Sequence, residues 1–151
     1  MADSEPPTIA YWHLWADDAG VTHQTRCEAR RFVLEGMGGK AAPQWNDHLL
    51  SGETSMLFAV LPVGWIGDWH ENPKPQWIVV LSGRWFVESM DGTRVEMGPG
   101  DLAFGGDQRA KPDRQGRLGH RSGTVGDEPC RLMIVQLDPA RWAGAAPGAF
   151  D

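Results

Sequence analysis

Short apolar segments recur along the chain and are separated by turns that contain glycine or proline. Residues 55–61 alternate along the chain with apolar side chains on both faces, which is typical of a strand buried between two layers. Residues 76–81 form a second apolar strand. The pattern predicts further strands over residues 84–89, 93–97, 101–104, 121–125 and 130–137. Residues 25–35 fit either a strand or a helix, and we favour a strand.

The segment Met90-Asp91-Gly92 joins two of these strands as a tight hairpin. Asp-Gly supplies the positive φ angles of a type I′ turn. Nothing from residue 55 to residue 137 shows helical spacing over a useful length. Short, regularly spaced strands without intervening helices predict an all-β sandwich or barrel, and a closed barrel leaves no strand edge exposed.

The alternation of the strands also predicts which side chains face the interior. If Gln76 points inward, Ile78 and Val80 do so too, while Trp77 and Val79 face the other layer. On the next strand the hairpin places Trp85 and Val87 inward. The outward side chains of that strand are then Arg84, Phe86 and Glu88.

The chain has 151 residues, the length of one domain. We expect a disordered leader over residues 1–8, a single barrel domain over residues 9–142 and a flexible tail over residues 143–151. The chain contains eight tryptophans. Because Trp12 and Trp15 look like apolar anchors left over from a small core, we predict a homodimer.

Charge and hydropathy exclude several classes of partner. The net charge is −6 and the arginines are scattered among acids, so no basic stripe could follow a nucleic-acid backbone. The longest apolar run, residues 77–81, is too short to cross a bilayer, and the acidic start does not resemble a signal peptide. We therefore expect a cytoplasmic protein with a small-molecule ligand, in which Cys27 and Cys130 are free thiols.

One stretch of the sequence carries candidate chemistry. His70 is followed by Asn72, Gln76 and Gly83 at the spacing of the first cupin motif, which this stretch resembles. Gly92 to Asp101, with Pro99-Gly100-Asp101, resembles the second cupin motif, and its metal-binding histidine would correspond to His120.

The resemblance extends beyond these motifs. The segments from Asp17 to His23, Trp69-His70 with Pro75-Gln76, Asp107, and Gly116 to Arg121 follow the order found in a group of small bacterial cupin-domain proteins. The similarity spans about Tyr11 to Leu137. It implies a cupin fold, that is, a jelly-roll or double-stranded β-helix barrel, but one barrel of this kind hosts many chemistries.

The resemblance also implies a site inside the barrel. Its metal ligands, if a metal is bound, would be His70, Gln76 and His120, holding one divalent ion such as Fe, Zn, Mn or Ni. Two of the four usual ligand positions hold neutral amides, Asn72 and Gln76, which lack the charge of a carboxylate and the basicity of imidazole. Residues 108–115 look like an inserted loop at the barrel mouth.

Other residues complete the candidate site. His70 and His120 are the catalytic candidates, and Trp85, Gln76, Asn72 and Asp107 are the candidates for binding substrate, with Asp107 able to orient His120. His23 and His48 are interpreted as loop histidines and His13 as structural.

Three functions fit these residues. A bound metal could polarise an oxygen of the substrate or activate dioxygen, as in cupin oxygenases, isomerases and lyases. A metal-free histidine could move a proton next to a carbonyl, as an isomerase, epimerase or dehydratase requires. Alternatively, an aromatic pocket could hold a small molecule without reaction. We favour an enzyme over a binding module, and expect the pocket to prefer flat or apolar ligands to phosphates, because no Arg or Lys falls on the inward set.

Overall fold

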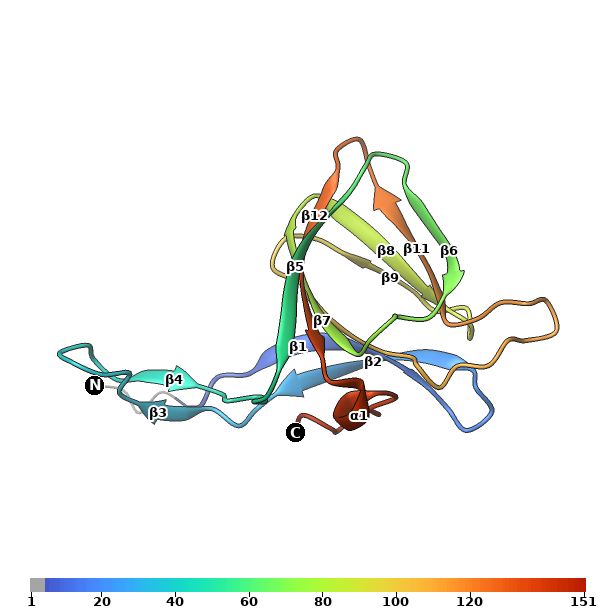
Figure 1. Cartoon of the computed structure of the whole chain (residues 1–151). Helices are drawn as coiled ribbons and strands as arrows, with labels where there is room; N and C mark the ends of the chain where they lie inside the picture. Colours follow the sequence, from blue (N-terminus) through green and yellow to red (C-terminus); the bar gives the residue numbers. More distant parts are fainter. Residues whose placement is uncertain (1–4) are drawn as a thin grey trace.

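The computed structural model describes residues 5–151, and these residues form strands with one short helix (Figure 1). The prediction of an all-β fold is confirmed, and most predicted strands are present with ends shifted by one or two residues. The elements are β1 (Ile9–Ala16), β2 (Thr22–Ala29), β3 (Val33–Glu35), β4 (Gln44–Asn46), β5 (Thr54–Leu61), β6 (Ile66–His70), β7 (Gln76–Ser82), β8 (Arg84–Ser89), β9 (Arg94–Met97), β10 (Leu102–Gly106), β11 (His120–Val125), β12 (Cys130–Leu137) and α1 (Pro139–Trp142).

Two sheets enclose the interior. One has six strands in the order β2-β1-β10-β7-β12-β5, and the other has four in the order β6-β11-β8-β9. Strands far apart in sequence are neighbours in both sheets, and β1 runs parallel to β10 while the other pairs are antiparallel. In Figure 1 the four-stranded sheet lies above β1 and β2, with β5 and β12 at the side.

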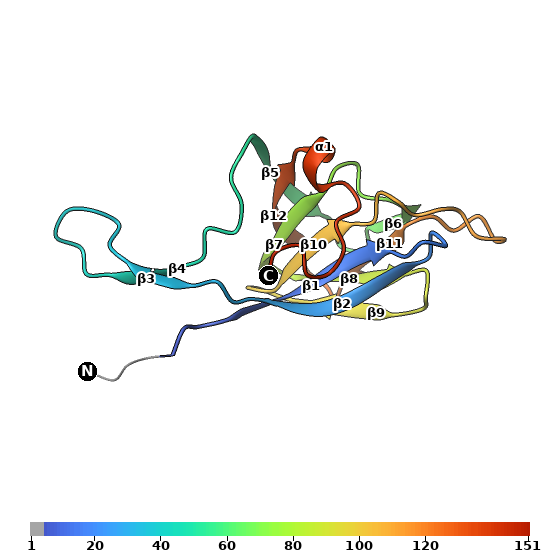
Figure 2. The same cartoon turned by 90° about the horizontal axis from the view of Figure 1, so that it is seen from below.

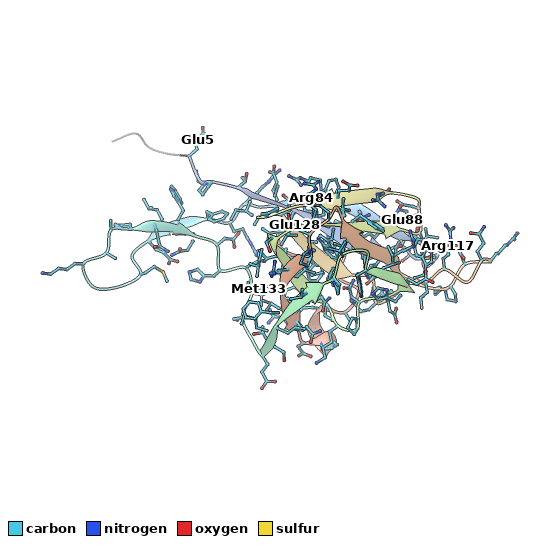
Figure 3. All side chains as sticks on the ribbon, turned by 90° about the horizontal axis from the view of Figure 1, so that it is seen from above. Glu5, Arg84, Glu88, Arg117, Glu128 and Met133 are labelled. Atoms are coloured by element: carbon cyan, nitrogen blue, oxygen red, sulfur yellow. The ribbon has the colours of Figure 1, made fainter. Side chains whose placement is uncertain are left out.

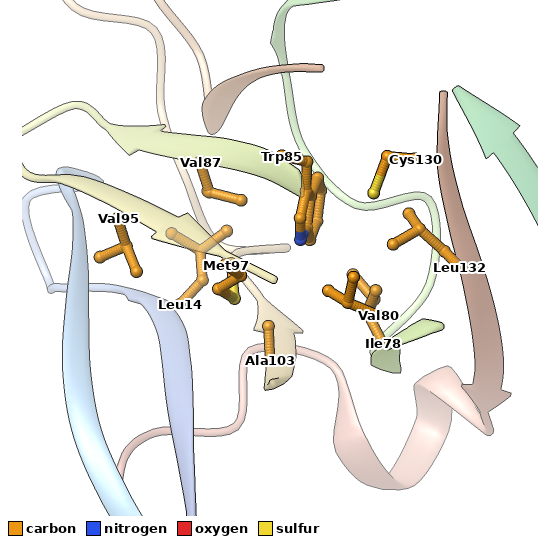
Figure 4. Close-up of a cluster of buried hydrophobic side chains, with 10 residues drawn as sticks. All are labelled: Leu14, Ile78, Val80, Trp85, Val87, Val95, Met97, Ala103, Cys130 and Leu132. Carbon is orange, nitrogen blue, oxygen red and sulfur yellow. The ribbon is translucent and has the colours of Figure 1, made fainter. Parts of the chain in front are cut away.

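The predicted alternation of β7 and β8 agrees with the structure. Ile78, Val80, Trp85 and Val87 belong to one buried cluster in the barrel interior (Figure 4). Phe86 faces outward as expected but is still buried, because the guanidinium groups of Arg94 and Arg121 lie over its ring, with centroid distances of 3.8 and 5.8 Å. Cation–π contact thus shields an outward aromatic ring from water.

The β8–β9 hairpin forms where it was predicted, but the type I′ turn was wrong. The hydrogen-bonded residues Ser89 and Thr93 enclose three residues, and only Gly92, at φ 86°, has a positive φ. Its N–H donates to Ser89 O at 3.0 Å, and Ser89 N–H donates to Thr93 O at 2.9 Å. A type I turn followed by one left-handed glycine is the usual solution for three residues, whereas type I′ needs two residues with positive φ.

The segment over residues 143–151, which was expected to be a flexible tail, packs on the outer face of the six-stranded sheet. Phe150 is fully buried and stacks on Trp142 at 4.9 Å. The main-chain oxygen of Ala145 is 2.7 Å from His13 Nε2, so the buried His13 has the structural role expected of it. An aromatic residue near the end of a small-residue segment is enough to dock that segment.

The expected strand over residues 25–35 is broken after Ala29. The chain leaves the barrel there and forms an arm, the β3–β4 hairpin with its flanking residues, that projects away from both sheets (Figures 1 and 2). With all side chains drawn, the arm still stands clear of the barrel (Figure 3). His48 lies beside the arm and hydrogen-bonds to Glu35.

The two indoles proposed as dimer anchors are used within the chain. Trp12 packs against the interior cluster, and the guanidinium carbon of Arg26 lies over its ring, 5.3 Å from the centroid. Trp15 donates a hydrogen bond to Thr25 Oγ1, and its ring lies against that of His23, with the centroids 4.9 Å apart and the planes tilted by 31°. The homodimer stays a prediction, and light scattering at micromolar concentration tests it by returning twice the monomer mass.

Cys27 and Cys130 are free thiols, as predicted. Burial raises the pKa of both thiols, which makes them poor nucleophiles at neutral pH. Among residues 5–151 no helix is long and apolar enough to span a membrane.

A carboxylate clasp, made of Asp17, His23 and Asp91, ties the two sheets together at one end. His23 lies in β2 rather than in a loop, and its Nε2 is 2.7 Å from Asp17 Oδ2 while its Nδ1 is 3.0 Å from Asp91 Oδ2. Asp91 belongs to the β8–β9 turn of the other sheet. The hydrogen bond with Asp17, supported by Asp91, raises the pKa of His23 although burial acts in the opposite direction.

This clasp predicts a pH dependence of stability. Since the folded pKa of His23 is above its unfolded value of 6.5, the stabilisation is fully present below pH 6.5 and is lost as the pH rises through the raised pKa. All three side chains are partly exposed, so we expect at most about 1 kcal/mol. Urea unfolding between pH 6 and 9 should show a flatter profile for His23→Gln than for wild type, and identical slopes would contradict the assignment.

Candidate functional site

Two neighbouring strands bring the candidate catalytic histidines together. His70 ends β6 and His120 begins β11, and the two residues are direct partners in the antiparallel ladder. Direct partners in such a ladder present their side chains on the same face of the sheet. The imidazole rings accordingly lie with their centroids 4.4 Å apart.

Gly119 makes this close approach possible. Its φ is +77°, and a Cβ built on it would lie 2.3 Å from His70 O and 2.7 Å from Glu71 Cα. Any larger residue would push β11 away from β6 at the point where the two histidines meet. The glycine before His120 in the sequence motif therefore has a geometric reason.

A buried carboxylate orients His120. Asp107, which follows β10, is fully buried, and its Oδ2 lies 2.8 Å from His120 Nδ1. Burial by itself raises the pKa of Asp107, but the hydrogen bond from His120, with two N–H groups of Asn72, outweighs it and holds the pKa below its usual range. Asp107 is therefore an anion that fixes the Nδ1–H tautomer and leaves His120 Nε2 as the basic nitrogen.

Asn72 completes the coordination of this carboxylate. Its backbone N–H and its Nδ2 both donate to Asp107 Oδ1, at 3.0 and 2.8 Å. A Cβ on Gly105 would lie 2.5 Å from the amide of Asn72, so this glycine leaves the space that the side chain occupies. The turn before Pro73, which could have been a plain surface turn, is thus part of the buried network.

A row of amides continues the network across the six-stranded sheet. Gln76 Nε2 donates to Asn72 Oδ1 at 2.8 Å, and Gln136 Nε2 donates to Gln76 Oε1 at 3.1 Å. The sequence interpretation missed Gln136, although a glutamine in the apolar strand 130–137 was a usable signal. It also missed Gln108, whose amide donates to Gly105 O and accepts from Gly144 N–H, and nothing local in the sequence marks that role.

His70 differs from His120 in its surroundings. Its side chain is exposed, and its Nδ1 lies 2.5 Å from the main-chain oxygen of Asp68. Because a carbonyl oxygen only accepts, Nδ1 must be the donor, and the neutral ring keeps its lone pair on Nε2. The site therefore presents two imidazoles of the same tautomer, one buried and tied to a carboxylate and the other open to solvent.

A cavity of about 140 Å³ adjoins these side chains inside the barrel. It is smaller than the roughly 300–1,000 Å³ of pockets for drug-sized ligands, so it suits a small molecule. No Lys or Arg lines it. Its walls include His70, Asn72, Gln76, Trp85, His120 and Ser122, with aliphatic side chains from β5, β7 and β12.

The structure brings every sequence-predicted site residue to one place. His70, Asn72, Gln76, Trp85 and His120 line the cavity, and Asp107 lies behind His120 and Asn72. A more open hollow of about 460 Å³ surrounds Lys74 and Asp138 but contains neither histidine.

The residues present do not fit a resident catalytic metal. A catalytic zinc site has three protein ligands, and here only the two imidazoles are strong ligands. The oxygen of Gln76 already accepts from Gln136, and that of Asn72 from Gln76. Among residues 5–151 no group of three or more His, Cys, Asp or Glu side chains is placed to hold an ion.

Several solved structures are similar to this chain. A cupin-domain protein from Salinispora arenicola is 20% identical, with 60% of this chain and 68% of that one covered and a TM-score of 0.44. A Silicibacter pomeroyi protein described as a sugar phosphate isomerase of the cupin superfamily is 17% identical, with 58% of this chain and 53% of that one covered and a TM-score of 0.40. The cupin domain of Schizosaccharomyces pombe Cnp3 is 12% identical, with 87% of this chain and 88% of that one covered and a TM-score of 0.41.

None of the curated proteins searched matches the chain. The sequence family described as Cupin domain matches residues 57–136, which is more than half of the chain and includes β6 to β11 with both site histidines. The resemblance noted in the motifs around His70 and Gly92 to Asp101 is thereby confirmed. The chain belongs to the cupin-domain family.

Proposed function

We propose that this protein is a metal-free enzyme that moves a proton next to a carbonyl group of a small, uncharged molecule. The observation that carries the proposal is the buried Asp107–His120 pair, whose basic Nε2 belongs to a side chain lining the cavity. A carboxylate that fixes the tautomer of a histidine and stabilises its protonated form is a recurrent device for general bases. A histidine that only fills a core needs no such partner.

In the reaction we envisage, His120 Nε2 takes a proton from the carbon beside the carbonyl, and the electron pair of the C–H bond moves onto the carbonyl oxygen. The resulting imidazolium is stabilised by Asp107, as a buried anion 2.8 Å away would do. The imidazolium of His120 then returns the proton to the other face of the same carbon or to another atom of the substrate, and His70, whose Nε2 also carries a lone pair, lies beside it with its ring centroid 4.4 Å away. Such a sequence is an isomerisation or epimerisation, and with a leaving group a dehydration.

Proton exchange tests this function without knowledge of the natural substrate. Cyclopentanone, cyclohexanone and γ-butyrolactone are incubated with the protein in D₂O, and loss of the C–H signal beside the carbonyl is followed by NMR. We expect wild type to accelerate exchange on at least one probe, and His120→Ala to lose roughly 10²- to 10⁴-fold, the usual contribution of a general base.

His48→Ala is the matched control, because His48 lies beside the arm, away from the cavity, and should leave the exchange rate unchanged. Equal rates for wild type and His120→Ala on all three probes would overturn the proposal and favour the alternative of a binding module.

Metal removal separates the proposal from a metal-assisted enzyme. Protein purified without a histidine tag should contain less than one equivalent of metal by elemental analysis. EDTA should change neither the exchange rate nor the melting temperature, because the hydrogen bonds of Asp107 hold the site together. Loss of exchange in EDTA with recovery on adding Zn²⁺, Mn²⁺, Fe²⁺ or Ni²⁺ would contradict the metal-free reaction.

A further inference from the structure

The outer face of the six-stranded sheet is covered over only part of its width. The segment 143–151 covers one part, where Phe150 packs with Trp77 and Phe104. Over β5 and the end of β7 the same face carries large apolar side chains that are about half exposed or more. These side chains, here called the β5 patch, are Met56, Phe58, Val60 and Leu81.

The β5 patch includes an edge strand that lacks the usual protection. Ala59 and Leu61 pack against the interior cluster, so the residues that alternate with them on β5 face outward. In the part of the chain that the structure describes, β5 pairs with β12 alone. Native edge strands usually carry a charge or a proline, or are covered, whereas residues 54–61 contain neither a charged residue nor a proline. Such an edge favours contact with another chain.

The arm carries a second group of exposed apolar side chains. Val33, Leu34 and Met37 are each more than half exposed, and none of the three belongs to either buried cluster of residues 5–151. The hairpin of the arm has only three residue pairs. Because an isolated two-stranded hairpin is marginally stable at best in water, the arm would be stabilised by a contact that its own barrel does not provide.

The arm and the β5 patch lie on the same side of the molecule but diverge. In Figure 1 the arm runs outward from the lower end of β5, and in Figure 3 Met133, the partner of Phe58 on β12, lies on the side toward the arm. The arm therefore does not cover the patch of its own chain. Nine extended residues reach up to about 30 Å, and the eight residues of β5 span about 26 Å, so the arm of another copy can span the patch.

A second copy of this chain is the occupant that fits both surfaces. Residues 33–46 hold one acid, Glu35, and one base, Lys40, and β5 has no charge, so no like charges meet although the chain has a net charge of −6. The seven side chains offer on the order of several hundred Å² per copy, against roughly 800 Å² per partner in a stable interface. In a two-fold dimer one operation covers both arms and both patches.

We propose that two copies of this chain form a dimer with two-fold symmetry, in which the arm of each copy packs across the β5 patch of the other. This interface uses side chains other than Trp12 and Trp15, which are engaged within the chain. It is independent of the reaction proposed for the cavity.

A pair of charged substitutions tests the exchange of arms. Leu34→Lys on the arm and Phe58→Glu on β5 each place a charge in a contact that occurs twice per dimer. At roughly tenfold per contact, each variant alone should raise the dissociation constant of the dimer about a hundredfold. In an equal mixture of the two, the mixed dimer has one unchanged contact and opposite charges across the other. We expect that mixture to dimerise within about tenfold of wild type, as measured by sedimentation velocity.

Ile66→Glu is the matched control, because Ile66 is also an exposed apolar residue but belongs to the four-stranded sheet. It should leave the dissociation constant unchanged. If Leu34→Lys dimerises like wild type while Phe58→Glu does not, the β5 strands pair with each other and the exchange of arms is overturned. Two monomeric variants whose mixture is also monomeric would overturn it as well.

Wild type alone decides if a variant fails to fold. Hydrogen–deuterium exchange is followed at protein concentrations below and above the dissociation constant of the dimer. We expect the amides of residues 33–46 and 54–61 to exchange more slowly at the higher concentration, because both segments become covered. A protein that stays monomeric at high micromolar concentration, or a dimer that protects amides of the four-stranded sheet instead, contradicts the proposal.

Discussion

Replacing Asp107 by alanine should lower the free energy of unfolding by about 3–5 kcal/mol, the usual cost of removing one partner of a buried charged pair. Three donors lose their acceptor together, namely the backbone N–H and Nδ2 of Asn72 and the Nδ1–H of His120. None of them can turn to water, because Asn72 and His120 are themselves buried. Urea unfolding at pH 7 measures the change.

Asp127→Ala is the matched control for this variant. Asp127 is exposed in the turn between β11 and β12 and should change stability by less than about 0.5 kcal/mol. A loss below about 1 kcal/mol in Asp107→Ala would mean that the carboxylate is not the centre of the network, and would remove the support for His120 as an oriented base.

Two glycine substitutions in one loop should show how much of the loss of stability comes from a steric clash and how much from backbone strain. Gly119 and Gly116 have φ angles of +77° and +78°, but a Cβ on Gly116 would meet nothing within 4 Å. Gly116→Ala should therefore cost only the roughly 1–2 kcal/mol of a left-handed residue with a side chain. Gly119→Ala bears the same cost and in addition forces the main chain of His70 away.

We expect Gly119→Ala to be less stable than Gly116→Ala by about 1–3 kcal/mol, the range for inserting atoms into a packed region. Because the displaced atoms belong to His70, the proton exchange rate should fall in Gly119→Ala and stay near wild type in Gly116→Ala. Thermal unfolding and the D₂O assay measure both effects. Equal losses of stability in the two variants would show that the main chain of His70 moves aside without a cost in free energy.

The sequence predicted the parts of the fold that depend on local alternation. The inward positions of Ile78, Val80, Trp85 and Val87 follow from a period of two, which a strand cannot escape without turning every side chain to the other face. The site residues were found through their motif spacing. Their geometry was not, because the pairing of His70 with His120 is a matter of strand register between distant segments.

Other features depend on contacts that no local pattern reveals. The docking of Phe150 needs the aromatic surface of Trp77 and Phe104 on the outer face of the sheet. The turn at Gly92 was misjudged because type I′ was assigned to Asp-Gly within a three-residue connection, and of the three residues enclosed by the Ser89–Thr93 hydrogen bond only Gly92 has a positive φ. The partner of Gln76 was missed because Gln136 lies 60 residues away.

The amide row between Gln136 and His120 has a direction. Gln136, Gln76 and Asn72 each donate toward Asp107, and His120 donates to it from the other side. A carboxylate can only accept hydrogen bonds, so Asn72 must turn its NH₂ group toward Asp107. The oxygen of Asn72 then faces Gln76 and accepts from it, and the oxygen of Gln76 in turn accepts from Gln136 in β12. The neutral isosteric substitution Asp107→Asn removes this constraint, because an amide side chain can present either its oxygen or its NH₂ group to a neighbour. Such a protein would be divided between two opposite polarities of the whole row, visible as doubled side-chain amide signals of Asn72 and Gln76. One buried charge thus selects a single arrangement among polar groups it does not touch.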